Sequence, residues 1–292
     1  MKKFLTLFLA LAGLSALGYA QESDDCTTQV TFYSPSIVRI YKTGPDNPDT
    51  KQSLSVTMNP EQVKTTVTTA KDGTVLYKSS VLTVKVDDND VTFMDKKGNI
   101  LLAENGFGHG NVAMTRPEYA DIAVDQGFDL DADEPLYGIG IQQDGKMAKS
   151  GTYRRMIQGN TDDYCNIIQS IKGYGLFWDN YSPTTLGIEE GKFYFTSENA
   201  GCVDYYFIWG GDADGVIAGI RQLTGTVPML PLWSYGFMQS RERYKSSAEL
   251  TEVLDRYRSI GVPIDVMIQD WQYWGSNYLW NAMEFNAPEF SN

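Results

Sequence analysis

The densest group of residues that could bind a ligand lies near the end of the sequence. Asp270 is followed directly by Trp271 and, three residues later, by Trp274. A carboxylate accepts hydrogen bonds from neighbouring sugar hydroxyls, and aromatic rings cover the apolar C–H face of a sugar. Residues 270–274 therefore predict a carbohydrate pocket. Two alternatives are structural: Asp270 caps the next segment or pairs with Arg241, and the aromatic rings pack a domain interface.

Two strands joined by a helix are expected to position this group. The pattern predicts strands at residues 233–238 and 264–268 and, between them, a helix at 246–260 that begins with the Ser246–Glu249 capping box. Such a βαβ unit has parallel strands. Because the carboxyl ends of parallel strands form the binding face, we expect Arg241 and Asp270 to border one cleft.

The preceding residues predict a different architecture. Residues 28–206 contain short runs that alternate apolar and polar side chains, as at 54–58 and 81–86. Turn sequences such as Asp72-Gly73 separate the runs, as expected for hairpins. Many short antiparallel strands over this length indicate a β-sandwich.

A helix and a stiff segment connect the two parts. Asp212 or Asp214 can cap a helix that carries apolar residues at helical spacing from 216 to 223, and Gly225 ends it. Residues 227–231 contain two prolines, each of which fixes φ and disfavours helix before it. We place the domain boundary here.

The first twenty residues predict a secretory signal peptide. Lys2 and Lys3 precede an almost wholly apolar run at residues 4–17, and Gly18 and Ala20 supply small residues at positions −3 and −1 of a cleavage site before Gln21. The apolar run is shorter than the ~20 residues that a spanning helix needs. We expect a protein exported to the periplasm or the medium, without a membrane anchor after cleavage.

Composition restricts the partners. The net charge of −13 disfavours nucleic acid and anionic membranes, and a neutral substrate fits better. The only histidine, His109, lies in a glycine-rich stretch that predicts a loop without a catalytic role, which leaves chemistry by carboxylates. The single histidine excludes a His-rich metal site, and the absence of a CxxC pair leaves a zinc site of that type unsupported. We expect no metal site and no cofactor. A disulfide between two of Cys26, Cys165 and Cys202 stays open.

Several sequence blocks, in order and at family-like spacing, resemble glycoside hydrolase family 31. They are residues 137–140, 172–181, 233–241 and 263–271. The last two resemble the start of the family's catalytic barrel, in variants similar to bacterial α-xylosidases and related α-glucosidases. The resemblance covers nearly all of the chain after residue 20.

The resemblance implies a fold and an activity. The implied fold is a galactose-mutarotase-like β-sandwich over residues 21–226, followed at 227–292 by the first part of a (β/α)8 barrel. The implied activity is hydrolysis of α-linked xylose or glucose from oligo- or polysaccharides by a retaining mechanism, which needs two carboxyl groups about 5–5.5 Å apart. Which α-linked sugar is cleaved stays open.

The resemblance also implies site residues. Asp270 matches an aspartate that binds hydroxyls of the sugar being cleaved, and Trp271 matches its neighbour in that subsite. With Trp274 and Arg241 at the same strand ends, we predict four substrate-binding residues there. A sandwich loop that reaches the active site in this family falls near residues 160–162, which makes Asp162 a further candidate.

The catalytic aspartates are expected beyond residue 292. A complete barrel needs about 250 residues, and residues 227–292 hold only its beginning. Trp178-Asp179 is a superficial match to the family's nucleophile motif, but it lies within the predicted sandwich. We expect the 292-residue chain to be truncated and inactive by itself.

Two other classes of function are compatible with a sandwich alone. One is a non-catalytic carbohydrate-binding or mutarotase-like protein, which has no need for a βαβ unit after residue 231. The other is an adhesion or scaffold protein, whose sequence would contain repeats of the sandwich. The chain shows no internal repeat.

Overall fold

The computed structural model describes residues 26–43, 52–112, 121–280, 282–285 and 287–290. The chain divides into two compact units, Met1–Thr226 and Val227–Asn292. The predicted signal peptide lies outside the described residues.

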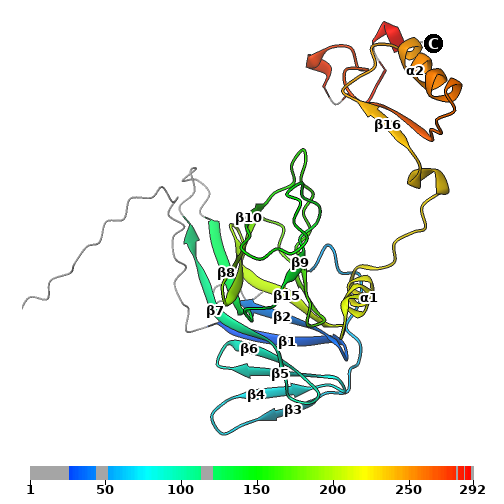
Figure 1. The fold of residues 1–292 in the computed structure, drawn as a ribbon. Helices are drawn as coiled ribbons and strands as arrows, with labels where there is room; N and C mark the ends of the chain where they lie inside the picture. Colours follow the sequence, from blue (N-terminus) through cyan, green and yellow to red (C-terminus); the bar gives the residue numbers. More distant parts are fainter. Residues whose placement is uncertain (1–25, 44–51, 113–120, 281, 286, 291–292) are drawn as a thin grey trace, which may run out of the picture. The chain divides into compact units, whose positions relative to one another are not determined.

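The first unit is built from two antiparallel sheets (Figure 1). Its described residues give one sheet in the order β1 (Thr27–Ser34), β2 (Ile37–Thr43), β15 (Cys202–Trp209), β12 (Tyr174–Trp178), β11 (Ile167–Ser170) and β9 (Leu136–Gly138). They give a second sheet in the order β10 (Tyr153–Met156), β13 (Thr184–Glu189), β14 (Lys192–Ser197), β8 (Asp121–Asp129), β7 (Ile100–Val112), β6 (Asp90–Asp95), β5 (Leu82–Asp87), β4 (Val75–Lys78) and β3 (Thr66–Thr69). The predicted β-sandwich is confirmed.

Aromatic side chains from both sheets form much of the core. The indole of Trp178 on β12 stacks on Phe195 of β14 with ring centroids 5.1 Å apart, and its Nε1 donates to Ser197 Oγ at 2.9 Å. Phe93 on β6 stacks on Phe207 of β15 at 4.0 Å. These contacts join the two sheets, because each pair takes one ring from each of them.

A buried polar network crosses the same core. Lys42 Nζ on β2 lies 2.6 Å from Glu104 Oε2 on β7 and 3.0 Å from Gln126 Oε1 on β8. Glu104 also accepts from the Tyr205 hydroxyl at 2.7 Å and from the Val91 amide at 2.6 Å. Burial raises the pKa of Glu104, and the contacts with Lys42 and Tyr205 oppose that rise.

Helix α1 (Ala213–Thr224) covers part of the outer face of the six-stranded sheet. Its predicted ends are confirmed: Asp212 caps the first turn, and Gly225, at φ +90°, follows the last residue. The helix approaches the sheet closely at Gly219, where an added Cβ would lie 2.4 Å from Ile208 Cγ2. A larger residue there would push the helix off the sheet.

Residues 54–58 do not form the strand that their alternation predicts. They run as coil beside the end of α1, where the amides of Thr57 and Met58 both donate to Leu223 O. Leu223 O is one of the last helical carbonyls, which lack a partner within the helix. Val56 and Met58 instead pack against an apolar cluster that includes Leu223 of α1 and Ile208 of β15.

His109 lies in a strand, and the prediction of a loop there was wrong. It belongs to β7 and pairs with Val124 of β8. The glycine signal marks a bulge in the ladder between Glu104 and Phe107, with Gly106 at φ +80°. The strand continues beyond the bulge, as bulged strands commonly do.

The second unit contains the predicted βαβ arrangement. Strand β16 (Met238–Arg241) pairs in parallel with β17 (Val266–Gln269), and helix α2 (Ser247–Ser259) connects them. Short 3₁₀ helices occur at Leu232–Tyr235, Asn277–Leu279 and Pro288–Phe290. The Ser246 side chain caps α2 by accepting from Glu249 N, whereas the Glu249 carboxylate binds the amide of Lys245.

Both strands begin later than predicted. Residues 232–235 form a 3₁₀ turn instead of a strand, because the amide and hydroxyl of Ser234 both donate to Pro231 O. The ladder starts near Phe237, whose amide is held by the Asp265 carboxylate at 3.1 Å. The strands therefore begin five and two residues after the predicted positions.

The connection between the units should be sensitive to proteases. Residues 226–231 are exposed and lie outside helices and strands. We expect limited subtilisin digestion to cut this segment first and to leave a stable sandwich fragment that ends near residue 230. Mass spectrometry of the digest checks this, and first cleavage inside either unit would contradict it.

Candidate functional site

The ends of β16 and β17 lie side by side. Met238 pairs with Val266 and Arg241 with Gln269, so the residues that follow leave the sheet at the same edge. The contact continues past the strands, where the Trp271 amide donates to Glu242 O at 2.9 Å. The expectation that the two blocks meet is confirmed.

A hollow of about 580 Å³ opens beside these strand ends. It is lined by Arg243, Tyr244, Lys245, Trp271, Gln272, Gly275, Ala287, Pro288, Glu289 and Phe290. Of the predicted site residues at these strand ends, Trp271 lines the hollow, whereas Arg241, Asp270 and Trp274 are not among its lining residues. This volume is in the usual range for small-molecule sites, which is about 300–1,000 Å³.

Tyr244 is the site residue that the sequence reasoning missed. Its side chain is 1% exposed, and its hydroxyl has no hydrogen-bond partner among the described residues. A buried hydroxyl without a partner loses free energy that a ligand hydroxyl can restore. Its place directly after the first strand end, three residues beyond Arg241, was the signal available in the sequence.

The indoles after β17 form a packed cluster. Trp271 contacts Trp280 edge to face with ring centroids 4.0 Å apart, and Trp274 at 5.5 Å. Trp274 is 6% exposed, whereas Trp271 is half-buried. Trp271 can therefore offer part of its ring to a ligand, and Trp274 serves mainly to hold it in place.

Arg241 and Asp270 do not pair with each other. Arg241 Nη1 lies 3.3 Å from Glu249 Oε1, and its guanidinium carbon lies 5.4 Å from the centre of the Tyr244 ring. Asp270 is exposed, and its carboxylate has neither an ion pair nor a hydrogen bond within the described part of the chain. The structural alternative in which Arg241 neutralises Asp270 is therefore wrong, and the carboxylate is accessible to a ligand.

Two aspartates of the sandwich have different surroundings. Asp162 Oδ2 accepts a hydrogen bond from the Tyr164 hydroxyl at 3.0 Å. Burial and this carboxylate raise the pKa of Tyr164. Asp179, whose motif superficially resembles a nucleophile motif, lies at the end of β12 and is 1% exposed. None of these contacts tests the predicted sugar-binding role of Asp162, which stays a prediction.

Neither a disulfide nor a metal-ligand group occurs in the described residues. Cys26, Cys165 and Cys202 form no disulfide with one another. No three of the described histidine, cysteine, aspartate and glutamate side chains are placed to hold one ion. In the same residues, no helix has the length and apolar character required to cross a bilayer.

Two family models match the chain. That of the glycosyl hydrolase 31 N-terminal galactose mutarotase-like domain matches residues 27–186. That of the glycosyl hydrolases family 31 TIM-barrel domain matches residues 227–292. The chain belongs to glycosyl hydrolase family 31. The sandwich and the βαβ unit are thus the family's N-terminal domain and the start of its barrel.

Individual relatives and solved structures support the same family assignment. An α-xylosidase of Saccharolobus solfataricus is 33% identical over 273 residues, which cover 90% of this chain and 37% of the relative. The fold matches a family 31 α-xylosidase of Xanthomonas citri at a TM-score of 0.80 and 20% identity, over 93% of this chain and 47% of that one. It also matches a family 31 dextranase of Flavobacterium johnsoniae in complex with glucose, at a TM-score of 0.76 and 21% identity. This match covers 96% of this chain and 36% of the dextranase chain. The chain spans little more than a third of the length of the Saccharolobus solfataricus α-xylosidase.

Proposed function

We propose that this chain forms the sandwich and the first barrel strands of an exported retaining α-glycosidase, which releases α-linked xylose or glucose from oligo- or polysaccharides. The observation that carries the proposal is the edge where β16 and β17 end. There Asp270 and Trp271 directly follow β17, beside the end of β16, in the part of the chain that matches the family 31 barrel. The relatives support this choice of sugars, because they include α-xylosidases and a dextranase with bound glucose.

Each site residue has a binding role in this proposal. The accessible Asp270 carboxylate accepts hydrogen bonds from two sugar hydroxyls, and the half-buried Trp271 ring covers an apolar face of the sugar. Arg241, held by Glu249, contacts the ring of Tyr244, which lines the hollow. We assign neither catalytic carboxylate to these 292 residues.

The full-length enzyme tests the proposal. We expect it to hydrolyse nitrophenyl α-xyloside or α-glucoside with retention of anomeric configuration, which proton NMR of the first-formed sugar detects. The 292-residue chain is the control and should show no turnover. Hydrolysis of β-xyloside in preference to both α-glycosides, or inversion, would contradict the proposal.

The βαβ unit argues against a function based on the sandwich alone. A carbohydrate-binding or mutarotase-like sandwich does not need β16, α2 and β17, and these elements fall within the match to the barrel. We therefore propose no second function.

Export gives a separate prediction. If residues 1–20 are a signal peptide, the protein isolated from its source should begin at Gln21. Mass spectrometry of the intact mature protein measures this. Recovery of the protein with residues 1–20 still attached would contradict export by this route.

A further inference from the structure

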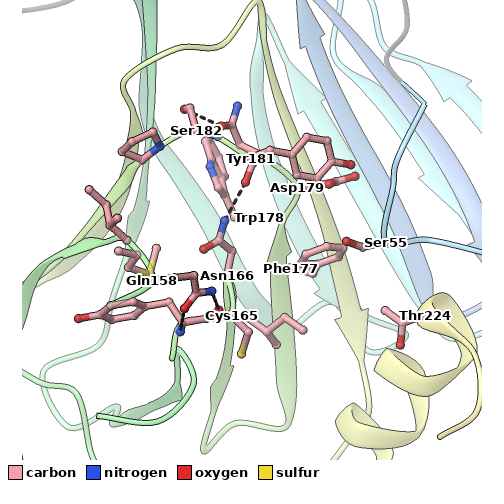
Figure 2. Close-up of a pocket in the computed structure, with 16 residues that line it drawn as sticks. Ser55, Gln158, Cys165, Asn166, Phe177, Trp178, Asp179, Tyr181, Ser182 and Thr224 are labelled. Atoms are coloured by element: carbon pink, nitrogen blue, oxygen red, sulfur yellow. Dashed lines mark hydrogen bonds between the residues drawn. The ribbon is translucent and has the colours of Figure 1, made fainter. Parts of the chain in front are cut away.

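A second hollow lies on the sandwich, where β11 begins and β12 ends (Figure 2). Its volume is about 660 Å³. Its lining comes from Ser55, residues 156–158, 164–167 and 177–183, and Thr224. None of these residues belongs to β16, to β17 or to the segments that follow them.

The hollow contains a fixed aromatic ring. The Tyr181 hydroxyl accepts a hydrogen bond from the Leu54 amide at 2.5 Å, which holds the ring at its outer end. The residue is nevertheless 51% exposed. An immobilised ring that remains open to solvent can stack on the C–H face of a ligand with little further loss of side-chain entropy. Phe177 and Ile167 add apolar surface to the lining.

Two asparagine amides present one acceptor and one donor. Asn166 Nδ2 donates to Asn180 O at 2.9 Å, which fixes the amide and leaves Asn166 Oδ1 without a partner among the described residues (Figure 2). Asn180 Oδ1 accepts from both the amide and the hydroxyl of Ser182 at 2.8 Å. The Asn180 Nδ2 group therefore has no acceptor in the described structure. Because both amide orientations are set by these bonds, the acceptor and the donor are preorganised.

The charges in the hollow exclude anionic ligands. The lining contains the carboxylate of Asp179 and no lysine, arginine or histidine. Phosphate and carboxylate ligands are usually held by such cations. A ligand that suits this site is neutral, has a flat apolar face for Tyr181, and carries adjacent hydroxyls, one to donate to Asn166 Oδ1 and one to accept from Asn180 Nδ2.

We propose that this hollow is a second saccharide-binding site, which holds a short neutral glycan on the sandwich by stacking on Tyr181 and by hydrogen bonds to Asn166 and Asn180. The choice of a saccharide among neutral polyhydroxy ligands rests on the proposed function. Such a site would hold part of a long substrate on the sandwich.

The test is a titration of the 292-residue chain with isomaltose and with methyl α-xyloside, in which saturation-transfer NMR detects the bound sugar. We expect Tyr181→Ala to raise the Kd of the bound sugar at least about tenfold, because the stacking surface is lost. Tyr181→Phe keeps the ring but loses the bond from the Leu54 amide, so it should raise the Kd clearly less than Tyr181→Ala does. Tyr153→Ala is the matched control, since Tyr153 is 61% exposed on β10 and lies outside the hollow.

The outcomes separate this site from the strand-end site. Trp271→Ala, titrated in the same way, should leave the signal that depends on Tyr181 unchanged. If the proposed function fails and this inference holds, Trp271→Ala changes nothing while Tyr181→Ala still weakens binding. Absence of saturable binding, equal effects of Tyr181→Ala and Tyr153→Ala, or equally tight binding of open-chain sorbitol would overturn the inference.

Discussion

Replacing Asp270 by alanine is expected to lower kcat/KM of the full-length enzyme for its nitrophenyl α-glycoside by about 100-fold or more. A hydrogen bond to a charged group contributes about 1.5–3 kcal/mol, and the carboxylate is proposed to accept two from the cleaved sugar. The Asp270 carboxylate has no ion pair or hydrogen bond among the described residues. The loss of activity should therefore come without a loss of stability.

The control for this prediction is Asp255→Ala. Asp255 is an exposed aspartate on α2 of the same unit, so its replacement removes the same charge at a place remote from the strand ends. We expect kcat/KM of this variant to stay within about twofold of the parent enzyme. Equal activity losses in the two variants would mean that net charge matters and that Asp270 does not bind the sugar.

Replacing Lys42 by methionine is expected to lower the free energy of unfolding of the sandwich by about 3–5 kcal/mol. The ammonium group is completely buried and neutralises Glu104, so its removal leaves a buried carboxylate with two neutral donors. Urea unfolding, followed by hydrogen exchange of peptides from β2 and β15, assigns the loss to the sandwich.

The matched control is Lys85→Met. Lys85 pairs with Asp87 at a similar distance, 2.7 Å, but both side chains are solvent-exposed. Because exposed pairs contribute about 0–1 kcal/mol, this variant should unfold almost as the parent does. The double variant Lys42→Met, Glu104→Gln should recover part of the loss, since it removes the unpaired charge. A Lys42→Met loss no larger than that of Lys85→Met would refute the role of the network.

The Lys42→Met variant should also depend on pH in a defined direction. Burial already raises the pKa of Glu104, and removal of the ammonium group should raise it further. The native state then keeps a proton that the unfolded state has lost, so stability falls as pH rises through the native pKa. We expect the deficit to be larger at about pH 8 than at about pH 5.

The periodic parts of the fold could be predicted from sequence because local signals and packing agree there. Strand β5 alternates buried and half-buried residues as its sequence does, and α1 carries both its cap and its terminal glycine. The prediction failed where long-range bonds decide the structure. Alternation at residues 54–58 predicted a strand, but the hydrogen bonds from the amides of Thr57 and Met58 to Leu223 O hold this segment as coil.

The candidate site was predicted in outline only. The order of strand, helix and strand was sufficient to bring Arg241 and Asp270 to one edge, because parallel pairing follows from the connection. Which side chains contact one another within the second unit could not be predicted from residue types. Arg241 contacts Glu249 on α2 instead of Asp270, and the orphan hydroxyl of Tyr244 depends on burial that only the folded structure shows.

The position of a bound sugar tests the central claim most directly. A crystal structure of the full-length enzyme soaked with xylose or glucose should show two sugar hydroxyls about 2.5–3.0 Å from the Asp270 carboxylate oxygens, with the ring against Trp271. A sugar seated in the barrel without contact to Asp270 or Trp271 would contradict the account.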